Sequence, residues 1–400
     1  MMKKFSKSYL EKYQNISRSI EEDYINLHPI QAGGRIPNDP LVLRTIIDFI
    51  DGYSTCDFCL SGKLNEIDTP PICDLHNDLA KFCNMDSARL TPGCRQAQYS
   101  AIHALTNPGD TILIDSTAHY TTYLCAERAN VNVKEIPNLG SPFYELKFDY
   151  VNDLIEKVKN NSGKNPKLIF LTHVDYNYGN VYDVKKLGKI AHDNNIPFMI
   201  NGAYTIGRMP ISGKELGADI MTASLHKSFA SPAPSGLLLV NEPYDNVIFK
   251  GSEFKGEWSK RTFHNKEVEF LGCTLPGVIT MGVMAAFPHV VKRVENWNKE
   301  VKNAQFFSKE LEKLDGIHQL GQKPHQHDLL KFETPILYEI SKNHPRKGFF
   351  LYEELKKNKV WGVQPGITKS LKISTYGQSL ENLKYCIDVF SKIIDNFNKN

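Results

Sequence analysis

The chain has 400 residues, of which 41% are hydrophobic and 23% charged, and its net charge is only +3. A chain of this size can bury a substantial core, and its small net charge excludes a protein that coats nucleic acid wholesale. No apolar run approaches the length of a membrane span, and residues 1–11 are lysine-rich without a hydrophobic core, so we expect a cytoplasmic protein with no membrane association. Its eight cysteines are then expected to be thiols rather than a disulfide framework.

The first 60 residues are expected to form an N-terminal arm and a cysteine loop. Apolar spacing predicts a helix over 1–26 and another over 41–50, separated by an irregular loop. The C-x-x-C pair Cys56 and Cys59 follows, and zinc, redox and iron–sulfur chemistry all compete for such a pair. The sequence contains no second C-x-x-C pair, which argues against a four-cysteine zinc site.

Residues 61–290 are expected to form a large α/β domain. After a predicted helix over 74–82, short apolar strands alternate with amphipathic helices, which is typical of a mostly parallel sheet covered on both faces. The predicted strands are 89–91, 111–115, 132–136, 167–172, 196–203, 219–225 and 236–240, and the predicted helices are 95–105, 120–129, 149–159 and 184–194.

Residues 291–400 are expected to form a smaller C-terminal α+β domain, because long charged helices replace the alternating pattern. The predicted helices are 291–314, 347–358 and 380–397, and the predicted strands are 334–340 and 371–375.

One predicted strand of the large domain leads into Ser224, His226 and Lys227, just before a loop of small residues. A lysine at the mouth of a buried strand is well placed to form a Schiff base. An earlier predicted strand ends with the polar residue Asn201. This layout is typical of the pyridoxal-phosphate (PLP) enzymes of fold type I, so we expect Lys227 to carry PLP.

Gly93, Cys94 and Arg95 lie between a predicted strand and the helix that follows it. Backbone N–H groups at a helix N-terminus bind anions, and glycine permits close approach of the backbone. We therefore expect the phosphate of PLP at this turn, with further contacts from Ser224 and His226.

Three other predicted strand ends supply candidate contacts to the ring of PLP. His119 is expected to stack on the ring, Ala203 to pack on its other face, and Asn177 to reach its hydroxyl group. Asn201 stands where most proteins of this fold have an aspartate against the ring nitrogen. An amide can only hydrogen-bond there, which weakens the electron sink and suits an elimination with a good leaving group.

Taken together, these residues resemble the archaeal family of Sep-tRNA:Cys-tRNA synthases. The segments that carry the resemblance span most of the chain and are 26–34, 52–59, 91–96, 118–120, 201–203 and 224–228. The resemblance implies a PLP-dependent homodimer that converts O-phosphoseryl-tRNA(Cys) to cysteinyl-tRNA(Cys) with sulfur from a donor. It leaves open whether a phosphoseryl-tRNA synthetase and an accessory protein also bind.

The resemblance also implies roles for particular residues. The functional cysteines of the family match Cys56, Cys59 and Cys273, which are implied to hold a persulfide or, in the alternative, an iron–sulfur cluster. Arg95, His119 and Tyr120 match positions that grip the phosphate of the substrate, and a cation with two donors suits a leaving dianion. Two neighbouring thiols would give the C-x-x-C spacing a purpose, because one thiol can release sulfur that the other has delivered.

Two other functions compete with this interpretation. A cysteine desulfurase or related free-amino-acid lyase would need a nucleophilic cysteine on a loop downstream of the lysine, whereas Cys386, in a predicted helix, is the C-terminal domain's cysteine. A scaffold that binds tRNA without turnover would not need Lys227. Lys372 stands where enzymes for free amino acids usually place an arginine for the α-carboxylate, and this modestly favours an ester substrate.

Overall fold

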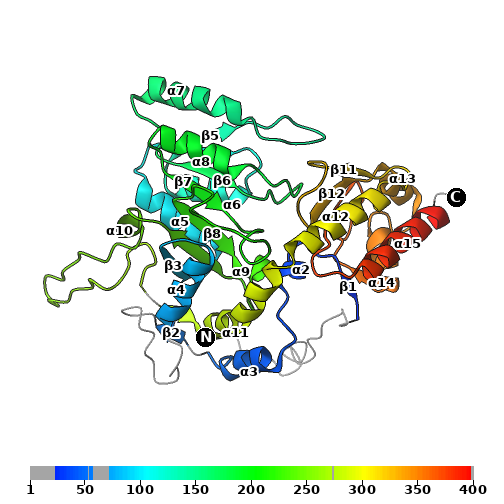
Figure 1. Ribbon diagram of the computed structural model, residues 1–400, viewed down its shortest axis with the longest axis horizontal. Coiled ribbons are helices and arrows are strands. Elements are labelled where there is room, and N and C mark those ends of the chain that lie inside the picture. The colour runs from blue at the N-terminus through cyan, green and yellow to red at the C-terminus, as the bar shows by residue number, and fades with distance from the viewer. Residues whose placement is uncertain (1–22, 53, 57–71, 273, 398–400) are drawn as a thin grey trace, which may run out of the picture.

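The computed structural model describes residues 23–52, 54–56, 72–272 and 274–397 (Figure 1). Most of the helix predicted over 1–26 lies outside the described residues, but Ile25–Asn26 form a short strand, β1, instead of helix. β1 pairs in parallel with β13 (Val360–Trp361), because the N-terminal arm lies against the C-terminal unit. The predicted loop after it contains the one-turn helix α2 (Gln31–Gly34). The helix predicted over 41–50 is present as α3 (Pro40–Asp48), which Asp39 caps.

A seven-stranded sheet organises the large unit, and the expected mostly parallel α/β fold is confirmed. Its strand order is β3-β9-β8-β7-β6-β4-β5, and β9 alone runs antiparallel to its neighbours within this sheet. In that order the strands are Ser87–Thr91, Gly236–Val240, Ile220–Ser224, Phe198–Asn201, Ile169–Thr172, Thr111–Asp115 and Asn132–Ile136.

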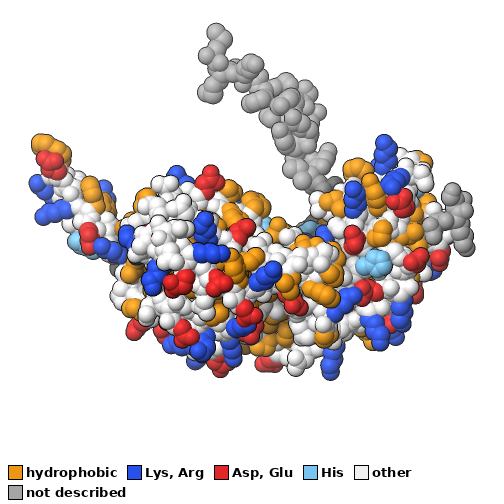
Figure 2. Space-filling view, turned by 90° about the horizontal axis from the view of Figure 1, so that it is seen from above, with side chains coloured by type: hydrophobic (Ala, Val, Ile, Leu, Met, Phe, Trp, Pro, Cys, Tyr) orange, Lys and Arg blue, Asp and Glu red, His pale blue; other side chains and the backbone are white. Residues whose placement is uncertain are grey.

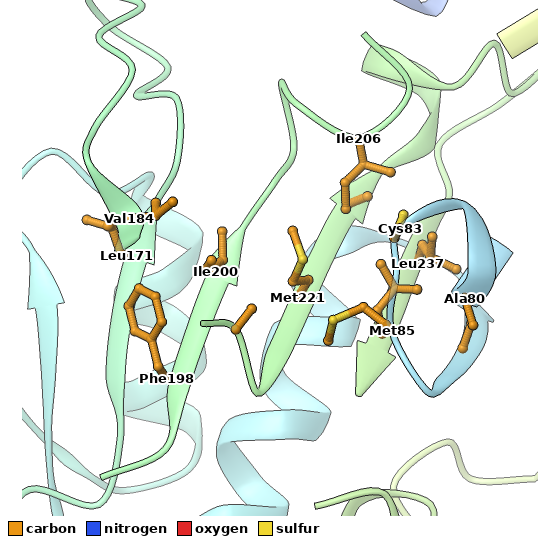
Figure 3. Close-up of a cluster of buried hydrophobic side chains, with 14 of the residues drawn as sticks. Ala80, Cys83, Met85, Leu171, Val184, Phe198, Ile200, Ile206, Met221 and Leu237 are labelled. Atoms are coloured by element: carbon orange, nitrogen blue, oxygen red, sulfur yellow. The ribbon is translucent and has the colours of Figure 1, made fainter. Parts of the chain in front are cut away.

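Helices cover both faces of this sheet (Figure 1). They are α4 (Ile72–Phe82), α5 (Cys94–Leu105), α6 (Tyr120–Arg128), α7 (Val151–Ser162), α8 (Val184–Asp193) and α10 (Asp245–Ile248), and a 3-10 turn at Phe148–Tyr150 precedes α7. Successive strand residues enter opposite cores: Leu171 and Ile200 pack with α7 and α8, whereas Phe170 and Met199 pack with α5 and α6. Figure 3 shows the first of these cores, with Met221 and Leu237 beside Met85 and Cys83. Because both faces of the central strands are buried, nearly all residues of these strands must be apolar.

The C-terminal unit is built on the three-stranded antiparallel sheet β11-β12-β14. Its strands are His318–Leu320, Leu329–Glu333 and Ser370–Ser374, and its helices are α12 (Trp297–Leu311), α13 (Pro335–Asn343), α14 (Phe349–Lys357) and α15 (Leu380–Phe397). These elements share one hydrophobic core, to which the N-terminal arm contributes Leu27. The helix predicted over 380–397 and the strand predicted near 371–375 are confirmed.

Two predictions for this region are wrong. Residues 335–343 form helix α13 and not a strand, because Pro335 is pre-set for the first helical position and the spacing of Leu337 and Ile340 buries one helical face. The single helix predicted over 291–314 is in fact two, since α11 (Gly277–Val294) ends before Asn296, which occupies the N-cap position of α12.

A long segment between α10 and β10 (Thr274–Pro276) projects from the body of the molecule (Figures 1 and 2). It carries Trp258, which is 90% exposed, and Phe254 at 63%. Within the described part of the chain, no helix is long and apolar enough to cross a membrane.

Candidate active site

A cavity of about 200 Å³ opens at the edge of the large sheet where its parallel strands end. The sequence-predicted residues that line it, in chain order, are Gly93, Cys94, Arg95, His119, Tyr120, Asn201, Ala203, Ser224, His226 and Lys227. Segments more than one hundred residues apart in sequence thus meet at one place, as the strand-end pattern predicts.

Asn177 is not among the residues that line this cavity. Its backbone N–H donates to Asp175 Oδ1 at 2.9 Å, within a tight loop after β6. The neighbouring Tyr176 reaches the cavity instead. A contact between Asn177 and a bound ring stays a prediction that the lining does not support.

The turn before α5 is shaped for an anion. Gly93 occupies the N-cap position of this helix, and a Cβ on it would meet no atom within 4 Å. The facing Gly236 of β9 lies so close that a Cβ there would come within 2.4 Å of Cys94 N. Among the described residues, the backbone N–H groups of Cys94 and Arg95 have no hydrogen-bond acceptor. These amides point out of the helix end, where an anion is stabilised.

The amide of Asn201 at the end of β7 has a fixed orientation. Its Oδ1 accepts a hydrogen bond from the backbone N–H of Ala203 at 3.1 Å and faces the Cys94 thiol at 3.8 Å. Because the backbone N–H can only donate, the oxygen must lie on that side. The Asn201 Nδ2 group therefore remains as the donor available to a partner in the cavity.

His119 lies at the N-cap of α6 and is neutral near pH 7. Burial lowers its pKa to about 4, and the nearby charges of Lys227, Lys372 and Arg95 add to the effect. Its Nδ1 accepts from the backbone N–H of Thr121 at 3.3 Å, which leaves Nε2 to carry the proton. The imidazole also meets the ring of Tyr176 edge-on, with centroids 4.7 Å apart.

Lys227 lies on the one-turn helix α9 (Leu225–Ser228), which directly follows β8. Its Nζ stands 4.8 Å from the ring centroid of the buried Tyr204. Helix α2 packs so closely on α9 that a Cβ on Gly34 would lie 1.8 Å from the carbonyl oxygen of His226. A residue at the N-terminal arm thus fixes the backbone that carries the lysine.

A buried ion pair supports the same backbone. Arg208 and Asp328 are both fully buried and paired, and Arg208 Nη2 also donates to the carbonyl oxygen of Lys227 at 2.9 Å and to that of Pro29 at 3.1 Å. Asp328 precedes β12 of the C-terminal unit. Arg208 therefore joins the large unit, the N-terminal arm and the C-terminal unit behind Lys227.

The cysteines implied for sulfur chemistry lie partly outside the described residues, since Cys59 and Cys273 are not described. Cys56 ends β2 (Ser54–Cys56), which pairs antiparallel with β10, and its Cα partner is Thr274. Thr274 is the residue after Cys273 in sequence. Among the described residues, no group of three His, Cys, Asp or Glu side chains could hold a metal ion.

Sequence reasoning missed several parts of the site. Thr172, Tyr176 and Tyr204 line the cavity, and each lies at or just after the end of a parallel strand. The strand-end rule would have found them if it had been applied to every polar or aromatic residue there. Arg208 and Asp328 carry no local signal, because their pairing depends on how distant units pack.

Comparisons with known proteins agree with this geometry. A family model described as O-phosphoseryl-tRNA(Sec) selenium transferase, SepSecS, matches residues 112–395. An O-phospho-L-seryl-tRNA:Cys-tRNA synthase from Methanopyrus kandleri is 44% identical, over 97% of this chain and 98% of its own length. A synthase of the same name from Methanocaldococcus jannaschii is 45% identical, over 96% and 99% respectively.

Solved structures give the same relationship. A crystal structure of a SepCysS–SepCysE N-terminal domain complex matches with a TM-score of 0.87 and 44% identity, covering 97% of this chain and 99% of that one. A cysteine desulfurase from Thermococcus onnurineus matches with a TM-score of 0.68 and 16% identity, covering 92% of this chain and 95% of that one. The second likeness shows the fold alone, which is fold type I as expected.

Proposed function

Because this chain belongs to the family of O-phospho-L-seryl-tRNA:Cys-tRNA synthases, we propose that it converts O-phosphoseryl-tRNA(Cys) to cysteinyl-tRNA(Cys). The observation that carries the proposal is the single cavity in which Lys227, the α5 turn, His119 and Asn201 meet. A reaction at the β-carbon of an amino acid needs a base, an electron sink and a site for the leaving phosphate. The cavity has candidates for all three.

PLP fits the residues of this cavity. The unpaired N–H groups of Cys94 and Arg95, with Ser224 and His226, suit its phosphate, Asn201 Nδ2 suits its ring nitrogen, and Lys227 Nζ suits its aldehyde carbon. When bound, PLP withdraws electrons from the α-carbon of the substrate and makes the α-proton acidic. The amide of Asn201 would keep the ring nitrogen unprotonated, so this withdrawal is moderate. Ala203 would pack against one face of the ring and His119 against the other.

Lys227 then acts as the base that takes the α-proton, since its amine belongs to the lining of the cavity and is freed when the substrate amine takes its place. The C–O bond at the β-carbon breaks with its electron pair on the phosphate, and a carbon–carbon double bond remains. Arg95, Tyr120 and the Nε2–H of the neutral His119 surround the leaving dianion with one cation and two donors.

Sulfur delivery is proposed for Cys56, Cys59 and Cys273. A persulfide on one of them adds its terminal sulfur to the β-carbon, and a second thiolate attacks the sulfur still bound to the protein. That attack forms an enzyme disulfide and frees the new thiol. Sulfide then attacks this disulfide, which restores one persulfide and one thiol without an external oxidant or reductant. The pairing of Cys56 with Thr274 supports this, because it brings the chain beside Cys273 to the C-x-x-C segment. An iron–sulfur cluster on the same three cysteines is the alternative to be tested.

The expected partners belong to the same proposal. We expect a homodimer, with tRNA(Cys) carrying O-phosphoserine as the substrate and a separate sulfur donor. An accessory protein is supported by the relative solved in complex with SepCysE. Binding of a phosphoseryl-tRNA synthetase and a cytoplasmic location stay predictions.

Anaerobic incubation with O-phosphoseryl-tRNA(Cys) and labelled sulfide tests the function. We expect labelled cysteinyl-tRNA from the wild type and none from Lys227→Ala. A parallel incubation with free cysteine tests the competing desulfurase. Sulfide release from free cysteine, without any cysteinyl-tRNA from the phosphoseryl substrate, would reverse the assignment.

A further inference from the structure

A second cavity, of about 440 Å³, lies in the C-terminal unit and is separate from the one around Lys227. Residues from β12, β13, β14 and the N-terminal arm line it. The members that matter for its chemistry are His28, Lys331, Tyr352, Trp361, Gln364 and Lys372. Its volume is more than the cavity around Lys227 offers, and it is too large for a lone phosphate or carboxylate.

One wall of this cavity is aromatic. The rings of His28 and Trp361 stack, with centroids 5.0 Å apart and planes 14° from parallel. Burial and the charge of Lys372 lower the pKa of His28, so its ring is neutral. The two rings are held by the backbone, since Leu27 N–H donates to the carbonyl oxygen of Trp361 at 2.7 Å. A stacked pair of this kind is preformed, and nucleobases stack on the outer face of such aromatic rings.

The cavity also carries positive charge, from two lysines that form no ion pair with an acidic residue among those described. Lys331 Nζ donates to Ser370 Oγ at 2.8 Å, and Lys372 Nζ donates to the carbonyl oxygen of Tyr176 at 2.9 Å. Neither forms an ion pair with a carboxylate among the described residues, and no Asp or Glu is among the described residues that line the cavity. Partly buried cations left in this state favour an anionic ligand.

The cavity adjoins the candidate active site. Lys372 lines the second cavity and bonds Tyr176, which lines the first. Pro29 lines the second cavity, and its carbonyl oxygen shares Arg208 Nη2 with the carbonyl oxygen of Lys227. A ligand in the second cavity would therefore lie next to a substrate bound in the cavity around Lys227.

We propose that this cavity binds the 3′-terminal nucleotide of the tRNA, with the base against the Trp361 and His28 wall and the phosphate near Lys331 and Lys372. The inference rests on the proposed function, because that substrate carries its amino acid as an ester on the terminal ribose. The nucleotide must then lie a few bonds from the α-carbon that Lys227 approaches. The aromatic wall suits the face of the base, the two lysines suit the phosphate, and the amide of Gln364 suits the polar edge of the base.

The test measures whether the terminal nucleotide's contribution to tRNA affinity depends on Trp361. Holoenzyme is titrated with uncharged tRNA(Cys) and with the same tRNA lacking its terminal adenosine. For the wild type we expect the truncation to weaken binding by about 5- to 100-fold, the range for one stacked base. For Trp361→Ala we expect the two tRNAs to bind about equally, whereas Trp361→Phe, which keeps an aromatic face, should retain most of the difference.

Lys331→Ala, with Lys331→Arg as its matched control, repeats the test without touching the stacked rings. A truncation effect that is the same in Trp361→Ala, Lys331→Ala and wild type would overturn the inference. Competition by adenosine monophosphate and by inorganic phosphate gives a further check. If phosphate competes as well as the nucleotide does, the cavity is an anion site only and the inference is wrong.

Failure of the proposed function is seen separately. Wild type that converts O-phosphoseryl-tRNA(Cys), but shows no dependence of the truncation effect on Trp361 or Lys331, keeps the function and loses this site. Wild type that shows the dependence but makes no cysteinyl-tRNA keeps the site and loses the function.

Discussion

Arg208 and Asp328 form an ion pair in which both side chains are 0% exposed, and the same guanidinium donates to the carbonyl oxygen of Lys227 at 2.9 Å. Asp328 also accepts a hydrogen bond from Ser374 of β14. A buried charge of this kind is tolerated only when it is paired and hydrogen-bonded on most sides. The pair thereby ties the position of Lys227 to the packing of the C-terminal unit.

Arg208→Met should be strongly destabilising. It leaves Asp328 as an unpaired buried charge and removes the donor from two buried carbonyl oxygens, so we expect a loss of about 3–5 kcal/mol in the free energy of unfolding. Urea denaturation of the purified protein measures it. Arg44→Met, which breaks the exposed Arg44–Asp48 pair, is the control and should change nothing measurable. Equal effects of the two substitutions would refute the role given to Arg208.

Asn201→Ala should weaken cofactor binding. The substitution removes the Nδ2 donor and leaves the Ala203 N–H unpaired, so we expect affinity for PLP to fall by about tenfold, as for one lost hydrogen bond of ~1.5 kcal/mol. Equilibrium dialysis followed by the visible absorbance of the bound cofactor measures it. Asn201→Asp keeps the acceptor for Ala203 and should lose less. Wild-type affinity in Asn201→Ala would show that Asn201 does not face the ring.

Stability should rise as the pH increases from 4 to 6.5. Burial lowers the pKa of His76 to about 3 and those of His173 and His327 to about 4, so in this window the unfolded chain binds more protons than the folded one. Burial raises the pKa values of Asp115 and Asp175 to about 6, which acts in the opposite sense below pH 6. The three histidines outnumber the two carboxyls, so the net slope is positive.

Urea midpoints across this window measure that slope. Asp115→Asn removes one opposing carboxyl and keeps an acceptor for the Thr172 N–H, so the variant should show a steeper rise than the wild type. A flat or falling stability between pH 4 and 6.5 would mean that these histidines are not buried in the working protein.

Binding of tRNA should weaken above pH 8. Burial, with the charge of Lys227, lowers the pKa of Lys372 to about 8, so its amine is charged below that pH and neutral above it. Loss of a charge-assisted contact of ~1.5 kcal/mol to a phosphate would reduce affinity by about tenfold between pH 7 and 9. Lys372→Arg stays charged and should remove most of this dependence. Equal pH profiles for the two proteins would place the phosphate elsewhere.

The cysteines should separate the two halves of the reaction. We expect each of the three double variants that replace two of Cys56, Cys59 and Cys273 by serine to make less than about 1% of the wild-type cysteinyl-tRNA, because one thiol then remains and sulfur release needs a pair. Each should still release phosphate, which depends on the cavity around Lys227. Cys73→Ser, a half-buried thiol on α4, is the control and should keep both activities. Full activity in any of these double variants would remove both substituted cysteines from the mechanism.

The large unit was predictable because each of its strands enters two cores at once. Runs such as Thr111–Asp115 and Gly236–Val240 are apolar on both faces, so their pattern and their short length both predict buried strands. The residues that follow the parallel strands must then lie together at one edge of the sheet. His119, Asn201 and Lys227 were found on this basis. Asn177 shows the limit, since the loop after β6 turns on Asp175 and presents Tyr176 instead.

The C-terminal unit was less predictable for a physical reason. Its short strand β12 and the helix α13 both mix apolar with charged residues, and tertiary packing around Phe332 and Leu371 decides between strand and helix. The parallel pairing of β1 with β13 joins residues more than three hundred positions apart, and no local pattern signals it. The second cavity is lined by segments that are equally distant in sequence, so the sequence could not predict it.

Phosphate release is the measurement that tests the central claim most directly, namely that Lys227 acts on an ester of O-phosphoserine with tRNA. Holoenzyme without a sulfur donor is mixed either with O-phosphoseryl-tRNA(Cys) or with free O-phosphoserine. We expect the wild type to release phosphate from the tRNA ester far faster than from the free amino acid, and Lys227→Ala to release none from either. Equal or faster release from free O-phosphoserine, or undiminished release by Lys227→Ala, would contradict the account.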